Sequence, residues 1–197
     1  MFVHIPKTAG RSIAKGLFNR DRPKHITASE LKRLAPIKFE NYYTFAFVRN
    51  PWDRMVSFHS MLKTSQAGSH KALMRMCIER FGSNDFESFI RLVEFINHKD
   101  FSLKELGFES NYELHPQYVW LYEGSTLICD FVGRYENLLG EYNKLCINLN
   151  LHAKQNNLPR LGVSLNRGLY QTHYTPYTRD LIGCIFSKDI HTFEYEF

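Results

Sequence analysis

The sequence predicts an α/β fold in which a central parallel sheet is flanked by helices on both faces. Three short apolar runs have the length and composition of buried strands: residues 2–5, 43–48 and 127–132. Segments with apolar residues at helical spacing separate these runs. Strands that alternate with helices form parallel sheets, and such sheets bind ligands at the carboxyl ends of their strands. With 44% hydrophobic residues, the 197 residues are enough for one domain that spans residues 1–197.

In the first half of the chain, the sequence predicts strands that alternate with helices. In order, we expect a strand at 2–5, a helix at 11–19, a short second extended piece at 25–26, a helix at 27–34, a strand at 43–48 and a helix from Pro51. Thr27 and Glu30 have the T-x-x-E spacing of a capping box, which starts a helix. Proline at position 51 suits the first residue of a helix, where its missing N–H group is not needed.

The second half is mainly helical. We expect helices at 71–81 and 86–96, a strand at 127–132, a helix at 137–149, a long ordered loop at 151–174 and a last helix at 178–187. Asn84 and Asp85 form the start signal of the helix at 86–96. No internal repeat, low-complexity tract or flexible linker divides the chain, which favours the single-domain prediction.

The net charge of +5 and the pI near 9.0 favour an anionic partner. Lysine and arginine are spread along the chain without the blocks that nucleic-acid-binding arms carry, so we expect no nucleic-acid partner. The four cysteines are far apart and form no C-x-x-C pair, so we expect no metal site. The oligomeric state cannot be predicted from these features.

The apolar runs are far shorter than the roughly 20 residues that cross a bilayer, so we expect no membrane span. Met1 leads directly into the first strand without the regions of a secretory signal. This start predicts a cytoplasmic protein if Met1 is the natural first residue. Otherwise the chain is a lumenal domain separated from its membrane anchor.

The first motif lies at residues 6–12, between a predicted strand and a predicted helix. A loop that enters a helix presents main-chain N–H groups and the positive end of the helix dipole, which together bind phosphate or sulfate. Gly10 permits close approach of the main chain, Lys7 adds a positive charge, and Thr8 and Ser12 add hydroxyl donors. The loop predicts an anion cradle. It lacks the G-x-x-x-x-G-K-[ST] pattern of ATP-binding loops, so a kinase is not expected.

The second motif covers residues 45–57. Arg49 follows the most apolar predicted strand, and Ser57 lies two turns into the helix that starts at Pro51. Both side chains are suited to a second phosphate at the carboxyl end of the sheet. The alternative for Arg49 is a structural ion pair with Asp53 at helical spacing.

These two motifs resemble those of a known family. Residues 4–13 resemble the 5′-phosphosulfate loop of sulfotransferases, and residues 48–57 resemble their 3′-phosphate motif, closest to the carbohydrate branch, Golgi-type or bacterial. Residues 131–138 and 189–197 extend the likeness over most of the chain. The resemblance implies a P-loop-like three-layer fold and a transferase that moves a sulfuryl group from 3′-phosphoadenosine-5′-phosphosulfate (PAPS) to an acceptor hydroxyl, on a carbohydrate, by in-line displacement and without a metal.

The resemblance also implies roles for individual residues. The 5′-phosphosulfate is expected on the residues of the first motif: Lys7, Thr8, Ala9, Gly10, Arg11 and Ser12. The 3′-phosphate is expected on Arg49 and Ser57. Lys7 is expected to be catalytic as well, because it stabilises charge on the bridging oxygen of the leaving nucleotide. A late loop that closes the donor site in sulfotransferases is best matched by Arg167.

A general base must activate the acceptor hydroxyl, and two histidines compete for this role. His25 lies 24 residues before Arg49, which is similar to the position of the catalytic histidine in several sulfotransferase branches. His115 lies in a His/Pro/Gln segment that resembles one near the acceptor cleft of the carbohydrate enzymes. We favour His25, and Glu113 stays open as a carboxylate base. His4 is expected to support the loop, and Arg54 is expected on a helix surface or behind the site.

Two other functions remain open. One is a nucleotide-dependent phosphotransferase on a related P-loop scaffold, which the missing GK[ST] sequence disfavours. The other is a non-catalytic basic module that binds an anionic polymer. The acceptor itself cannot be read from the sequence, because acceptor choice depends on loops and on the region from about residue 66 to residue 122, where the resemblance is thinnest.

Overall fold

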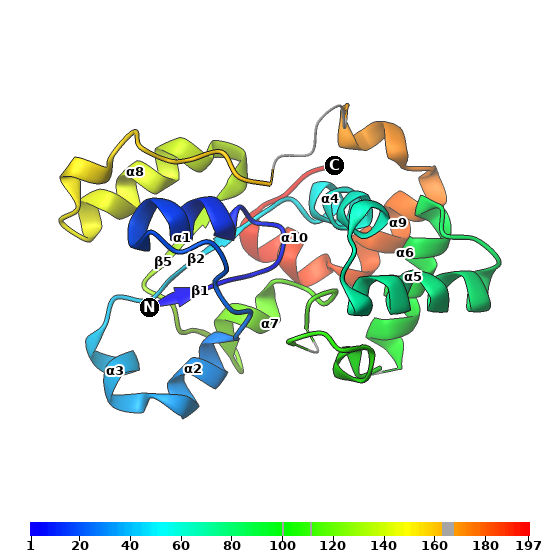
Figure 1. Ribbon diagram of the computed structural model, residues 1–197, viewed down its shortest axis with the longest axis horizontal. Coiled ribbons are helices and arrows are strands. Elements are labelled where there is room, and N and C mark those ends of the chain that lie inside the picture. Colours follow the sequence, from blue (N-terminus) through cyan, green and yellow to red (C-terminus); the bar gives the residue numbers. More distant parts are fainter. Residues whose placement is uncertain (100, 111, 163–167) are drawn as a thin grey trace. The chain divides into compact units, whose positions relative to one another are not determined.

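A computed structural model describes residues 1–99, 101–110, 112–162 and 168–197 (Figure 1). The chain forms two compact units, and the structure defines each of them by itself. The first unit comprises Met1–Arg49 and Gln117–Val163, and the second comprises Asn50–Pro116 and Ser164–Phe197. That residues 1–197 act as a single domain stays a prediction.

The first unit contains the parallel sheet that the sequence predicts. Its strands β1 (Phe2–Val3), β2 (Phe45–Val48) and β5 (Phe131–Arg134) lie in the order β1-β2-β5. Phe45 of β2 is in register with Phe2 of β1 and with Phe131 of β5. All four residues of β2 are buried, because this strand is central in the sheet and covered on both faces.

Helices cover both faces of this sheet, which confirms the predicted α/β class (Figure 1). In the figure, α1 and α8 lie on one side of the strands and α2, α3 and α7 on the other. A core cluster joins Ile13 and Leu17 of α1 to Phe47 of β2 and Tyr142 of α8. The bounds of the helices are α1 (Gly10–Phe18), α2 (Ala28–Leu34), α3 (Pro36–Asn41), α7 (Tyr118–Leu121) and α8 (Leu138–Asn148).

The second unit is helical in the part that the structure describes. Its main helices are α4 (Pro51–Thr64), α5 (Gly68–Phe81), α6 (Phe86–His98), α9 (Pro176–Ile185) and α10 (Ser187–Phe193). Apolar stripes of these helices meet in one core, which includes Phe58, Leu73, Phe89 and Ile182. Short 3-10 turns occur at Leu103–Leu106 and Tyr170–His173 in this unit, and at Tyr135–Asn137 and His152–Lys154 in the first.

Local signals in the sequence are confirmed at three helix starts. The Thr27 side chain and the N–H group of Glu30 form the predicted capping box at α2. Pro51 is the first residue of α4, and the Asn50 side chain accepts hydrogen bonds from the next two N–H groups. The Asp85 side chain caps α6 in the same manner. These contacts are short-range, so the sequence determines them directly.

Three sequence predictions are wrong. Residues 127–132 do not form one strand: β4 (Thr126–Leu127) pairs with β3 (Tyr122–Glu123) in an antiparallel ribbon, and β5 begins only at Phe131. Residues 25–26 belong to no strand. The chain also adds helix α10 after α9, where the sequence predicted a single last helix.

Asp130 explains the break between β4 and β5. Its carboxylate accepts a hydrogen bond from the N–H group of Thr44 at 2.6 Å, and its own N–H group donates to the Thr44 carbonyl at 2.8 Å. These bonds fix the turn into β5, so the apolar run cannot continue as one strand. Within the described residues, no helix is long and apolar enough to span a membrane. The cytoplasmic location stays a prediction.

Candidate functional site

The predicted anion loop leaves β1 and enters α1 through two residues in the left-handed conformation. Lys7 has φ 70° and Ala9 has φ 64°. Non-glycine residues rarely adopt this conformation; in this chain Asn19 and Glu194 adopt it at helix C-caps, whereas Lys7 and Ala9 adopt it in a loop before a helix start. Such turns direct successive N–H groups toward one side of the main chain and form anion-binding concavities. The loop therefore has the main-chain geometry of an anion cradle.

The start of α1 adds to this cradle. Ala9 is the N-cap, no side chain caps the helix, and the first turn contains no acidic residue. The first N–H groups of an α-helix have no partner inside the helix, and they carry the positive end of its dipole. An anion placed before Gly10 would satisfy these groups without displacing a capping side chain.

Position 10 has no room for any side chain, so a glycine is required there. A Cβ atom at this position would lie 1.9 Å from Cδ2 and 2.0 Å from Nε2 of His4. The His4 ring is buried, and its Nδ1 lies 3.0 Å from the Pro23 carbonyl, so the ring cannot simply swing away. The histidine and the glycine of the motif thus fit together as one packing unit, which the sequence indicated only as a loop glycine.

The hydroxyl groups of Thr8 and Ser12 hold the loop in place. Thr8 is fully buried and its Oγ1 donates to the Ile5 carbonyl at 2.8 Å. Ser12 Oγ accepts from the N–H group of Leu161 at 3.1 Å and contacts the Leu161 carbonyl at 3.4 Å. Their predicted role as anion ligands stays a prediction. Arg11 is exposed, and its Nε donates to the Asp21 carbonyl at 3.3 Å.

His25 stacks on His4 with a ring separation of 4.1 Å. Its Nδ1 lies 3.1 Å from the His4 carbonyl. A neutral imidazole that donates from Nδ1 carries its lone pair on Nε2, the form that a general base needs. Burial lowers the pKa of His4 to about 3, with further contributions from His25 and Lys7, so the supporting ring is neutral.

Arg49 directly follows β2, as predicted, and contacts with Lys7, Tyr135 and Gln117 hold it beside the loop. Its Nη1 donates to the Lys7 carbonyl at 2.9 Å, and its guanidinium lies 3.9 Å above the Tyr135 ring. The Gln117 side chain accepts from the Arg49 N–H group at 2.9 Å and donates to the Arg49 carbonyl at 2.7 Å. Only 3% of Arg49 is exposed.

Sequence reasoning missed Gln117 and Tyr135 as supports of Arg49. Both lie in segments that carry the family resemblance, but neither has a local pattern that indicates its partner 68 or more residues away. Arg167, the predicted residue of the late loop, lies outside the described residues.

The other predicted residues lie in the second unit. Ser57 is buried on α4, with 5% of its surface exposed. Arg54 is fully buried and donates to the carbonyls of Glu113 at 2.7 Å and His115 at 3.0 Å. The expectation that Arg54 could lie on the helix surface is therefore wrong. It fixes the backbone of the segment that contains both alternative bases.

Glu113, in the second unit, has a pKa that is shifted toward neutral pH. Burial is the main cause that raises its pKa from 4.5 to about 7; a hydrogen bond from the Ser110 main chain opposes this shift, and the nearby charge of Glu109 adds to it by a smaller amount. A carboxyl group with this pKa can accept a proton near neutral pH. His115 instead packs its ring edge-on against Tyr112 at 5.7 Å and has its main chain fixed by Arg54.

Comparison with known proteins gives one family. No curated protein and no solved structure matches the chain. A family model described as "Sulfotransferase family" matches residues 1–196. The match includes both anion motifs and nearly the whole chain. The chain therefore belongs to the sulfotransferase family, a family of transferases of the EC 2.8.2 type.

Proposed function

We propose that this sulfotransferase takes its sulfuryl group from PAPS and transfers it to a hydroxyl group of a carbohydrate. The observation that carries the proposal is the bond between the two anion motifs: Arg49 donates to the Lys7 carbonyl at 2.9 Å. In our proposal this bonded pair provides a loop for the 5′ side of a nucleotide and a cation for its 3′ side. A donor with phosphate groups at both positions matches this pair of motifs.

The residues present fit such a donor. The left-handed Lys7 and Ala9, the start of α1 without a side-chain cap, and the close packing of Gly10 on His4 leave a main-chain cradle of N–H groups. In our proposal the cradle from Lys7 to Ser12 holds the 5′-phosphosulfate, and Arg49, Ser57 and Arg167 hold the 3′-phosphate. When bound, PAPS supplies the activated sulfuryl group and leaves as the 3′,5′-bisphosphate.

Lys7 and His25 divide the catalytic work in this proposal. Lys7 places a fixed positive charge where negative charge develops on the leaving oxygen, which contributes several kcal/mol of transition-state stabilisation in comparable sites, on the order of 3 kcal/mol. His25 accepts the proton of the acceptor hydroxyl at Nε2, because its Nδ1 is engaged with the His4 carbonyl. His115 and Glu113 are the alternatives, and the pKa of about 7 at Glu113 supports the carboxylate.

The choice among the three bases has a direct kinetic test. His25→Asn retains an N–H donor toward the His4 carbonyl but has no basic nitrogen, whereas His115→Asn and Glu113→Gln remove the alternatives. We expect His25→Asn to lower kcat by about 10²–10⁴. The two other variants should retain most of the activity. A larger loss of kcat in either of these two variants would indicate that the general base is the residue substituted in it, which belongs to the second unit.

The first test of the donor is calorimetric titration with 3′-phosphoadenosine-5′-phosphate, ADP and ATP. We expect the bisphosphate to bind more tightly than ADP or ATP, and Arg49→Ala to weaken its binding by about tenfold or more. Arg20→Ala, which removes an exposed arginine of the same unit, is the control and should bind normally. Equal binding of ATP would favour a phosphotransferase, and absence of nucleotide binding would favour a non-catalytic basic module.

A further inference from the structure

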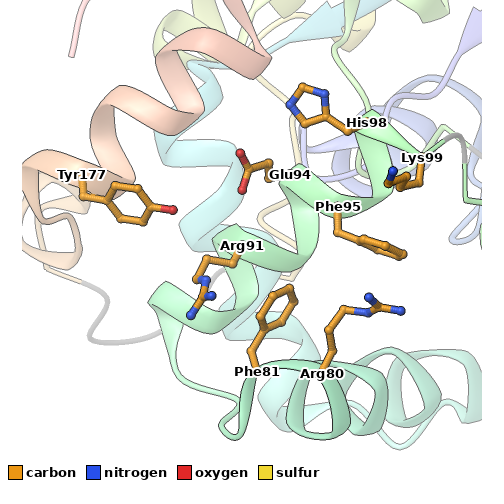
Figure 2. A pocket seen from close by; sticks show the side chains of 8 residues that line it. All are labelled: Arg80, Phe81, Arg91, Glu94, Phe95, His98, Lys99 and Tyr177. Carbon is orange, nitrogen blue, oxygen red and sulfur yellow. The ribbon is translucent and has the colours of Figure 1, made fainter.

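A groove in the second unit gathers positive charge from residues that belong to neither sequence motif. Figure 2 shows its lining: Arg80 and Phe81 come from the end of α5, Tyr177 comes from α9, and the remaining residues, Arg91, Glu94, Phe95, His98 and Lys99, come from α6 and its C-cap. The groove has a volume of about 320 Å³. This volume lies at the lower end of the range for ligand pockets, which starts at about 300 Å³.

The charges of this groove are unbalanced. Arg80, Arg91 and Lys99 are permanent cations, and Glu94 is the carboxylate among the described lining residues, which leaves a net charge of +2 with His98 neutral. Within the described part of the chain, neither arginine forms an ion pair. Both arginines and Lys99 are exposed. The groove is therefore complementary to an anionic ligand.

Two aromatic rings hold the arginines in place. The guanidinium carbon of Arg80 lies 3.8 Å from the centre of the Phe95 ring, and that of Arg91 lies 4.8 Å from the centre of the Phe81 ring. Each guanidinium lies over a ring, and its N–H groups can still donate hydrogen bonds. The fork of N–H donors on a guanidinium suits the paired oxygens of carboxylate and sulfate groups.

Helix dipoles do not account for this arrangement. Arg80, His98 and Lys99 lie at the C-terminal ends of α5 and α6, where cations are favoured. Arg91 lies in the middle of α6, so no helix end explains its position beside Phe81. The groove thus combines cations from two helices on one surface.

We infer that this groove binds an anionic polysaccharide that carries carboxylate or sulfate groups. The inference deepens the proposed function and rests on it, because it names the chemical class of the carbohydrate and assigns it a binding surface on the second unit. Polysaccharide is favoured over single-stranded nucleic acid because both phenylalanine rings are stacked against arginines. Nucleic-acid surfaces instead use such rings as platforms for bases. The exposed phenol ring of Tyr177 provides a further flat surface for a sugar.

The test is direct binding of a fluorescent heparin oligosaccharide to the full chain, with polyuridylate and neutral dextran as comparison ligands. The double variant Arg80→Gln with Arg91→Gln removes the stacked cations. The matched control, Lys71→Gln with Arg75→Gln, removes two exposed cations of α5 that do not line the groove. All variants are also titrated with 3′-phosphoadenosine-5′-phosphate, and their thermal unfolding is recorded.

We expect the groove variant to bind heparin about tenfold more weakly and the control to stay within about twofold of the wild type. Nucleotide binding should be the same in all three proteins. The inference is overturned if wild type does not bind heparin, if both variants lose affinity equally, or if polyuridylate binds in preference through the same arginines. If heparin binds through the groove but the nucleotide does not bind, the proposed function is overturned and the inference about the groove is still supported.

Discussion

Substitution of Gly10 by alanine tests how tightly the anion loop is packed. The added Cβ would lie 1.9 Å from the His4 ring, far inside van der Waals contact. The ring is buried, lies 3.0 Å from the Pro23 carbonyl and stacks on His25 at 4.1 Å. Accommodation of the methyl group must therefore move either the start of α1 or the His4–His25 pair.

We expect Gly10→Ala to lower the free energy of unfolding by about 1–3 kcal/mol, the usual cost of overpacking a buried site. For a chain of this size each kcal/mol corresponds to a fall in Tm of about 2–4 °C. Because the displaced groups form the cradle, binding of 3′-phosphoadenosine-5′-phosphate should weaken as well. Thermal unfolding and calorimetric titration measure the two effects.

A second substitution separates packing from other causes. His4→Ala in the Gly10→Ala background removes the ring that the methyl group meets, so the cost of the alanine should shrink relative to its cost in wild type. Gly16→Ala is a poor control because its Cβ would meet the Tyr142 hydroxyl at 2.6 Å, whereas Gly68 has open space around it. Gly68→Ala should leave nucleotide binding unchanged. The reasoning is refuted if Gly10→Ala retains both wild-type stability and wild-type affinity.

Three further predictions concern the groups around the site. Gln117→Leu removes both bonds to the Arg49 main chain and should lower stability by about 2–5 kcal/mol in urea unfolding, since two buried polar groups lose their partner; an unchanged midpoint would contradict the role of Gln117. The folded pKa of His4, about 3, lies below its ordinary value of 6.5, so stability is fully present above pH 6.5 and falls as the unfolded state takes up a proton. By pH 5 the loss should reach about 2 kcal/mol, and His4→Asn should remove this part of the pH dependence. The folded pKa of Glu113 is raised to about 7, so its charge destabilises the fold above its ordinary value of 4.5. Glu113→Gln should therefore raise stability by about 1–3 kcal/mol at pH 8 with little gain at pH 4, and the same gain at both pH values would argue against a buried charge.

The sequence predicted those parts of the fold that depend on neighbouring residues. The capping box at Thr27 and the helix start at Pro51 involve contacts across three residues or fewer, and both are confirmed. Apolar content also identified β2, because a fully buried strand needs no alternation of polar residues. The prediction of one strand over residues 127–132 was wrong because the carboxylate of Asp130 accepts a hydrogen bond from the N–H group of Thr44, which lies far away in the sequence.

The residue types of the candidate site could be predicted from the sequence, but the contacts that hold these residues in place could not. Lys7 and Ala9 are not glycines, so their left-handed conformation has no local signal and must be imposed by the surrounding structure. Arg54 has the position of a surface charge by helical spacing, yet its guanidinium is buried because two main-chain carbonyls accept from it. Such partners lie about 60 residues away, and no periodicity in one sequence identifies them.

His4 shows how a residue that holds the site in place also affects the charges around the proposed base. This one ring fills the space left by Gly10, contacts the Pro23 carbonyl and stacks on His25, whose Nδ1 lies near the His4 carbonyl. A positive charge on a ring in this position would be buried next to Lys7 and would repel a cation on His25. Burial that keeps His4 neutral therefore leaves the positive potential of the loop to Lys7 and the main chain, and it leaves the stacked face of His25 without a charged neighbour, as the proposed role of His25 as the base requires.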